Sequence, residues 1–216
     1  MITLNCKAIL FDLDGTLVDS ASRVERLWLE WGRRKNLDTQ HLLEVMHGRM
    51  AEETIRLVAP HLSSQEEYRV LETEEILDME GVRPYSNALE LIHQLSPRQW
   101  GVVTSGTVRV ATARMRHVGL PIPEVFITAD DVQAGKPRPD GYLLAAKRLH
   151  LDPSDCIVVE DAPAGIQAGK SAGMRVIGVS STLAKEALSQ ADIVISHLDQ
   201  LRLNVTDKAM SIHVNQ

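Results

Sequence analysis

The feature that most restricts the fold of this chain is a series of short apolar runs, each ending abruptly at polar or turn-forming residues. Such runs are typical of strands buried on both faces of a parallel sheet. Helix-length segments lie between most of them, and strands that alternate with helices predict a doubly wound, mainly parallel α/β sheet. The expected strands are 6–11, 99–103, 125–128, 156–159, 175–179 and 193–195.

Residues 18–82 interrupt this alternation, because they contain apolar residues at helical spacing and no convincing strand. Helices without strands cannot join the sheet layer, so they are expected to pack among themselves. We therefore predict that 18–82 form an inserted helical bundle, and that 1–17 and 83–216 form the α/β core domain. The polar tail from about residue 203 is expected to be loosely held.

The charge balance and the apolar pattern limit the partners and the location. The 216 residues carry 23 basic and 29 acidic side chains, a formal net charge of −6. Nucleic-acid binders usually show a basic excess, so no nucleic-acid partner is expected. No apolar stretch suits a signal peptide or a membrane span, so we expect a cytoplasmic monomer or weak dimer that contacts no membrane. Cys6 and Cys156 lie in apolar runs and are expected to be buried and reduced.

Carboxylates gather at one edge of the expected sheet. Asp12 and Asp14 follow the first apolar run, and Glu160 and Asp161 follow the fourth. In open α/β sheets ligands bind at the carboxyl ends of the strands, where these residues meet. Adjacent carboxylates raise one another's pKa, a divalent cation relieves the repulsion, and an all-oxygen site suits Mg²⁺. A single aspartate after a strand is more often a helix cap or turn residue, but the four together predict a metal site.

A possible anion site lies at the same edge. Thr104, Ser105 and Gly106 follow the second apolar run and precede an expected helix, whose first N–H groups favour an anion. For these three residues alone, helix capping is the ordinary interpretation. Lys136 lies on a stiff loop between a glycine and a proline, where its ammonium could neutralise a phosphate oxygen. Together with the carboxylates, these groups make a set suited to phosphoryl transfer.

These segments resemble, in order and at similar separations, the four motifs of the haloacid dehalogenase superfamily. The first is Asp12-Leu13-Asp14-Gly15-Thr16-Leu17-Val18-Asp19-Ser20, the second Thr104-Ser105, the third Lys136 in Gly-Lys-Pro, and the fourth Glu160-Asp161 in Val-Glu-Asp-Ala-Pro-Ala-Gly. The resemblance covers about residues 5–195. It implies a Rossmann-like core, with 18–82 at the place of the family's helical cap.

The resemblance also implies a role for the residues of the first two motifs. Asp12 would attack the phosphorus and become an aspartyl-phosphate. Asp14 would protonate the leaving alcohol and then deprotonate the water that hydrolyses this intermediate. Thr104, Ser105 and the Gly106 backbone would hold the phosphoryl oxygens, and either hydroxyl could provide the main contact.

The third and fourth motifs imply a cation and a metal site. Lys136 would link Asp12 to the phosphoryl group. Mg²⁺ would be bound by the carboxylates of Asp12 and Asp161, by the backbone carbonyl of Asp14, and by Glu160 directly or through water.

Two positions bear on the type of reaction. Family members that cleave carbon–halogen or carbon–phosphorus bonds lack an acid at the position of Asp14, so phosphotransfer is expected here. In the β-phosphoglucomutases a cap histidine lies at the position that an ungapped alignment gives to Val24. Its absence favours hydrolysis, although a mutase could recruit an acid or base elsewhere. A phospho-acceptor receiver module is the non-enzymatic alternative, against which the helical insertion and the Asp-x-Asp-Gly-Thr turn speak.

Selectivity for the substrate is expected to lie in the inserted bundle. Relatives that act on sugar and polyol phosphates place a similar segment to His47-Gly48-Arg49 at the active site, although helix capping and a solvated arginine explain it equally simply. Trp28 and Trp31 are expected in the core of the bundle. Segments 100–107 and 126–132 resemble glycerol-phosphate and deoxyglucose-phosphate phosphatases, and the chain is also similar to bacterial hexitol phosphatases. A small phosphorylated sugar or polyol is therefore the expected substrate.

Overall fold

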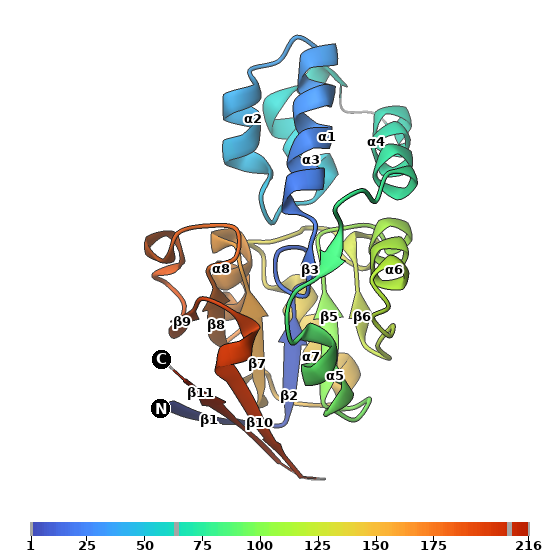
Figure 1. Cartoon of the computed structure of the whole chain (residues 1–216). Helices are drawn as coiled ribbons and strands as arrows, with labels where there is room; N and C mark the ends of the chain where they lie inside the picture. Colours follow the sequence, from blue (N-terminus) through green and yellow to red (C-terminus); the bar gives the residue numbers. More distant parts are fainter. Residues whose placement is uncertain (1, 63–64, 207–208, 216) are drawn as a thin grey trace.

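The core of the molecule is a six-stranded parallel sheet with helices on both faces (Figure 1). The computed structural model describes residues 2–62, 65–206 and 209–215. The sheet has the order β6–β5–β2–β7–β8–β9, and the expected doubly wound α/β fold is confirmed. Its strands are β2 (Ala8–Phe11), β5 (Trp100–Val103), β6 (Phe126–Ile127), β7 (Cys156–Glu160), β8 (Arg175–Val179) and β9 (Ile193–Ile195).

The side chains of this sheet enter two apolar layers. Ala8 and Leu10 of β2 face one layer, and Ile9 and Phe11 face the other, because successive side chains of a strand point to opposite faces. Helices α5 (Ala88–His93) and α6 (Val108–His117) cover one face, and α7 (Asp140–Leu149) and α8 (Pro163–Ser171) cover the other. Short 3-10 helices lie at Pro60–Leu62, Ala129–Asp131, Pro153–Asp155, Lys185–Leu188 and Leu198–Gln200.

The register of the sheet brings the polar ends of three strands to one level. Phe11 pairs with Val102 of β5 and with Val159 of β7. Asp12, the next residue, is therefore level with the ends of both neighbours, and its backbone N–H donates to the Val159 carbonyl over 2.9 Å. The residues that follow β2, β5 and β7 thus meet at one edge, as the sequence predicts.

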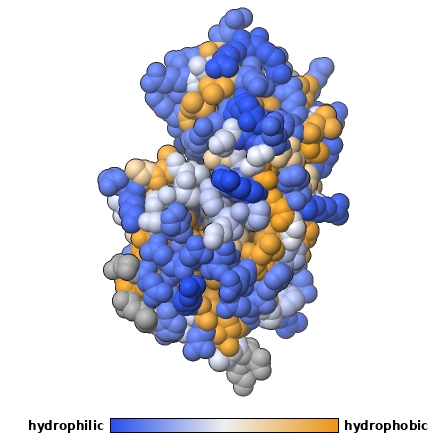
Figure 2. Space-filling view, viewed as in Figure 1, coloured by the Kyte–Doolittle hydropathy of each residue, from blue (hydrophilic) through white to orange (hydrophobic). Residues whose placement is uncertain are grey.

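Helices from the interrupting stretch pack above this edge as a separate bundle, called the helical cap below (Figure 1). It consists of α1 (Ala21–Arg34), α2 (Thr39–Met46), α3 (Ala51–Val58) and α4 (Gln65–Leu77). Trp28 and Trp31 are buried in its core, with ring centroids 5.5 Å apart in an edge-to-face arrangement, as expected. Figure 2 shows the cap as a smaller lobe on the larger core.

A two-stranded ribbon joins the cap to the core. Its strands are β3 (Val18–Asp19) and β4 (Arg83–Pro84), which pair antiparallel. The start of α1 is tied to the end of α4 because the buried Arg23 donates to the carbonyls of Glu74 and Asp78 over 2.8 and 2.9 Å. Both chain crossings between the lobes therefore lie side by side.

The expectation of a loosely held tail is wrong. Strands β10 (Leu201–Val205) and β11 (Met210–Val214) form an antiparallel sheet with β1 (Ile2–Cys6), in the order β1–β11–β10. Met210, Ile212 and Val214 are buried in the core, and only the alternate residues of β11 are polar. The first expected strand, 6–11, also starts two residues early, since Cys6 belongs to β1.

Cys6 and Cys156 are free and buried, as expected, and burial raises the pKa of each thiol to about 12. Within the described part of the chain, no helix combines the length and the apolarity that crossing a membrane requires.

Candidate active site

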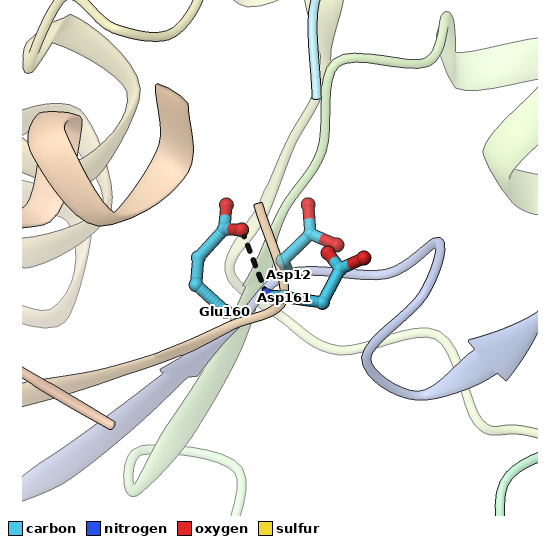
Figure 3. A group of neighbouring side chains, drawn as sticks. All are labelled: Asp12, Glu160 and Asp161. Atoms are coloured by element: carbon cyan, nitrogen blue, oxygen red, sulfur yellow. Dashed lines mark hydrogen bonds between the residues drawn. The ribbon is translucent and has the colours of Figure 1, made fainter. Parts of the chain in front are cut away.

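Three carboxylates meet where β2 and β7 end (Figure 3). Asp12 follows β2, Glu160 is the last residue of β7, and Asp161 follows it. One oxygen of each lies within 4.8 Å of the others, and all three residues are buried. Burial raises the pKa of Asp12 well above its ordinary range, although Lys136 opposes the rise. Burial and the charge of Glu160 raise the pKa of Asp161 to about 7. Burial and the neighbouring carboxylates therefore both disfavour the charged forms of these carboxyls.

Lys136 lies between two of these carboxylates. Its Nζ is 2.5 Å from Asp12 Oδ1 and 2.5 Å from Glu160 Oε1. Burial alone would lower the pKa of Lys136, but the two carboxylates outweigh it and raise the pKa above its ordinary value. The side chain therefore stays a charged ammonium. The loop that carries Lys136 also contacts the cap: the Gly135 N–H donates to Glu53 Oε1 of α3 over 2.9 Å.

Protein donors hold the Glu160 carboxylate on every side. In addition to the lysine, Tyr142 donates to Oε1 over 3.0 Å, and the N–H groups of Asp161 and Ala162 donate to Oε2 over 3.1 and 3.2 Å. Gly165, in the first turn of α8, leaves room for this carboxylate, since a Cβ there would lie 1.7 Å from Oε1. Alanine is the better helix former, so close approach is the reason for glycine here.

The carboxylate cluster fits a divalent cation. Three carboxylates and one ammonium leave an excess of two negative charges in a buried place. The available donors are all oxygens, which hard cations prefer. A cation beside Asp12 and Asp161 would favour the charged forms of these carboxyls, which burial disfavours. Gly15, which follows Asp14, packs against Asp161 so closely that a Cβ would lie 2.1 Å from Oδ2.

Asp14 lies at the border of the two lobes. Ser20 Oγ donates to its Oδ1 over 2.6 Å, and Arg114 Nη1 of α6 is 2.7 Å from its Oδ2. Arg114 Nη2 is also 3.4 Å from Glu75 Oε2 of α4, in the cap. The Asp14 side chain keeps 25% of its surface exposed, so it remains accessible from the space between the lobes.

The hydroxyl segment after β5 contacts both lobes. Thr104 Oγ1 accepts from the Gly106 N–H over 3.1 Å. Ser105 Oγ donates to the backbone carbonyl of Gly48, in the cap, over 2.9 Å. Thr107 caps α6 by accepting from the Val110 N–H over 3.3 Å. The two hydroxyls that the sequence leaves open as phosphate ligands thus have different partners: Thr104 bonds within its own turn and Ser105 bonds to the cap.

A cavity of about 460 Å³ lies between the cap and the core. Its lining includes most of the residues that the sequence singles out, from both lobes: Asp12, Asp14, His47, Gly48, Arg49, Thr104, Ser105, Gly106 and Asp161. Lys136 and Glu160 do not line it: Glu160 belongs to the carboxylate cluster, and Lys136 pairs with it and with Asp12 from within the core. α2 ends at Met46 and Gly48 has a φ of +72°, so His47-Gly48 terminates a helix as well as lining the cavity.

Sequence reasoning misses several residues that the fold brings to this place: Tyr142, Arg114, Glu75 and Thr182, whose hydroxyl bonds to Asp161. For Arg114 a signal exists, because it shares the buried face of α6 with Val110, Ala111 and Met115. A charged residue on an apolar helix face is uncommon and needs a partner.

The comparison with protein families agrees with the motifs. The model of the haloacid dehalogenase-like hydrolases matches residues 6–173. The chain belongs to this family. Hexitol phosphatase A of Escherichia coli (strain K12) is 43% identical over 203 residues, which cover 92% of this chain and 94% of that protein. Glycerol-1-phosphate phosphohydrolase 2 of Saccharomyces cerevisiae is 34% identical over 219 residues, covering 94% and 86%.

Solved structures of the family have the same architecture. A hydrolase from Pseudomonas syringae superimposes with a TM-score of 0.76 at 25% identity, covering 88% of this chain and 94% of its own. CbbY from Rhodobacter sphaeroides, solved in complex with phosphate, gives a TM-score of 0.75 at 25% identity, covering 89% and 94%. The family and fold expected from the four motifs are therefore confirmed.

Proposed function

We propose that this haloacid dehalogenase-like hydrolase is a Mg²⁺-dependent cytoplasmic phosphatase of small sugar or polyol phosphates. The observation that carries the proposal is the position of Asp12. Its buried carboxylate is paired with Lys136, lines the cavity between cap and core, and has Asp14 two residues further along the chain. The similar hexitol and glycerol-1-phosphate phosphatases support a phosphoric monoester hydrolase.

The proposed chemistry has two steps, both at phosphorus. A carboxylate oxygen of Asp12 attacks the phosphorus, the bond to the ester oxygen breaks, and Asp14 gives its proton to the departing alkoxide. Asp14, now a carboxylate, takes a proton from a water molecule that attacks the same phosphorus. The bond to Asp12 then breaks and inorganic phosphate leaves. Lys136 stays charged throughout and holds Asp12 in place.

Asp12 and Asp161 would hold the metal with the backbone carbonyl of Asp14, and Glu160 would contribute through water. The four hydrogen bonds that the Glu160 oxygens accept from protein donors support this indirect role. When bound, the cation supplies positive charge that balances the carboxylates and the phosphoryl oxygens.

Residues 18–82 would act as a cap domain that closes over the substrate. Hydrogen bonds from Ser105 to Gly48 and from Gly135 to Glu53 join the two lobes in the present arrangement. Closure would exclude bulk water while the aspartyl-phosphate forms. His47 and Arg49 would then contact the hydroxyl groups of the substrate, since both line the cavity. Its volume suits a small phosphorylated polyol.

An isomerase of the β-phosphoglucomutase type is the alternative. Val24, at the position where those enzymes have a cap histidine, lines the cavity and has no titratable group. This supports hydrolysis, because a mutase must protonate and deprotonate sugar hydroxyls in the cap.

The test is release of inorganic phosphate from a panel of hexitol, sugar and glycerol phosphates. Wild type is assayed with Mg²⁺ and with a chelator, beside Asp12→Asn. We expect one inorganic phosphate to be released for each alcohol formed. This release should be lost when the chelator is added and in Asp12→Asn. Isomerised sugar phosphate without free phosphate would favour the mutase, and stable phosphorylation of Asp12 without turnover would favour a receiver module.

A further inference from the structure

Arg114 is a buried charge with no role in the chemistry described so far. It is 4% exposed and lies on the face of α6 that packs against the core. Burying a guanidinium costs free energy unless partners compensate it. Among the described residues its charged partners are Asp14 in the core and Glu75 in the cap, and its Nε–H has no acceptor.

The contact with Asp14 completes the fixation of that carboxylate. Ser20 donates to one oxygen over 2.6 Å, and Arg114 lies 2.7 Å from the other. With a donor on each oxygen, rotation of the carboxyl group is restricted. A proton donor must lie within hydrogen-bond reach of the atom it protonates, so its orientation matters to the rate.

The contact with Glu75 links the same guanidinium to the cap. Glu75 is on α4, and burial raises the pKa of its carboxyl, with Arg114 opposing the rise. Arg114 can touch both carboxylates only when α4 is seated against α6. A second pair, Arg109 with Glu72, joins the same two helices, but among the described residues the ion pair of Asp14 is with Arg114 and not with Arg109. A variant of Arg109 therefore disturbs only the docking of the cap, whereas a variant of Arg114 also removes the contact with Asp14.

We propose that Arg114 is a positioning residue for Asp14, and that Glu75 of the cap holds Arg114 in the orientation this requires. The inference rests on the proposed phosphatase function. Through these two contacts, Asp14 is correctly placed only when α4 of the cap packs against α6 of the core. Water that reaches an open site would then meet an Asp14 that is not correctly placed.

Comparing substrates with different leaving groups distinguishes a misplaced acid from a general distortion of the active site. An alkoxide from a sugar or polyol needs a proton as it leaves, whereas p-nitrophenolate leaves readily without one. The value of kcat/KM reports the steps up to transfer of the phosphoryl group to Asp12. A misplaced acid therefore lowers kcat/KM for alkyl phosphates and spares p-nitrophenyl phosphate.

The experiment compares wild type, Arg114→Met, Arg114→Lys, Glu75→Gln and the control Arg109→Met. Each is assayed with p-nitrophenyl phosphate and with a hexitol phosphate or glycerol 1-phosphate, whichever wild type hydrolyses faster. For Arg114→Met we expect kcat/KM to fall roughly 10- to 100-fold on the alkyl phosphate and less than about threefold on p-nitrophenyl phosphate. Arg114→Lys should lose less activity than Arg114→Met, since lysine keeps the positive charge but lacks the forked guanidinium that contacts two carboxylates at once.

Glu75→Gln keeps a hydrogen-bonding side chain and serves if Arg114→Met does not fold; the same selective loss is expected, roughly three- to tenfold. Arg109→Met should change both substrates by the same factor. Equal losses on both substrates in Arg114→Met and Glu75→Gln, or no loss in either, would overturn this inference alone. A wild type that hydrolyses neither ester would overturn the proposed function, and the inference with it.

Discussion

At the scale of single residues, the centre of the site depends on opposite charges held in a dry place. Lys136 is the only basic side chain of the described residues in ion-pair contact with Asp12, and it also pairs with Glu160. Removing one member of a buried ion pair leaves the other charge without compensation, which costs more than the pair contributes by itself.

Replacement of Lys136 by methionine should therefore affect stability as well as activity. In metal-free protein we expect the free energy of unfolding to fall by about 3–5 kcal/mol, measured by urea denaturation. Addition of Mg²⁺ should raise the melting temperature of this variant more than that of wild type, because a cation replaces the missing charge. Lys147→Met, at an exposed position of α7, is the control and should change stability by less than about 0.5 kcal/mol. Equal stability of both variants would contradict the account.

The site residues were predictable to the extent that they follow strands. Asp12 and Asp161 come directly after apolar runs, and parallel strands bring such residues to one edge whatever the rest of the chain does. Arg114 and Tyr142 reach the site from helices, so their positions depend on how helices pack on the sheet. No local pattern specifies that packing.

At the scale of elements, the strands of the second sheet have an alternating apolar and polar sequence. Leu201, Leu203 and Val205 alternate with polar residues, as do the buried residues of β11. Such alternation is typical of strands with one solvated face. The polar residues on the solvated face of each strand make the segment resemble a loosely held tail, while the apolar residues on the other face cover the core beside β1.

Shortening the side chain of Ile212 tests whether β11 is part of the folded core. The residue is fully buried, so Ile212→Ala should lower the free energy of unfolding by about 2–5 kcal/mol, through lost apolar contact and a cavity. Ser211→Ala, one residue earlier on the partly exposed face of β11, should cost less than about 0.5 kcal/mol. Urea denaturation followed by circular dichroism measures both. A loosely held tail would make the two variants alike.

Glu67 joins α4 to α1 within the cap. Burial raises the pKa of its carboxyl, but hydrogen bonds from Lys35 and Trp31, at 2.9 and 2.5 Å, outweigh this and hold the pKa below its ordinary value. A lowered pKa in the folded state adds stability above the unfolded pKa, and this stability is lost as the pH falls. The cap should therefore weaken under acid conditions.

In the Trp100→Phe background, which removes the tryptophan of core strand β5, the fluorescence of Trp28 and Trp31 reports unfolding of the cap. Between about pH 6 and pH 3, the urea midpoint should fall less in Glu67→Gln than in wild type, since the variant has no carboxylate to protonate there. Glu66→Gln, at the exposed neighbouring position, should keep the pH dependence of wild type. Parallel curves for all three proteins would show that the Glu67 contacts do not stabilise the cap.

At the scale of the whole molecule, the core has an apolar cluster on each face of its sheet, the cap has one of its own, and polar contacts join the two lobes around the cavity. Thr107 donates to Glu72 Oε1 over 2.6 Å, beside the bonds from Ser105 and Gly135 to the cap. The sequence predicts both lobes, because each has its own periodicity. It does not predict the contacts between them, since these join residues far apart in the chain.

In the proposed mechanism Asp12 takes up the phosphoryl group and Asp14 supports both steps. The most direct test uses Asp14→Ala with p-nitrophenyl phosphate. The first step then needs no acid, while the second lacks its base, so phosphorylated protein should accumulate. We predict a burst of about one p-nitrophenolate per protein molecule with little free phosphate, and mass spectrometry should place the phosphoryl group on Asp12. Steady release of phosphate at the wild-type rate, or a burst that persists in Asp12→Asn/Asp14→Ala, would contradict the account.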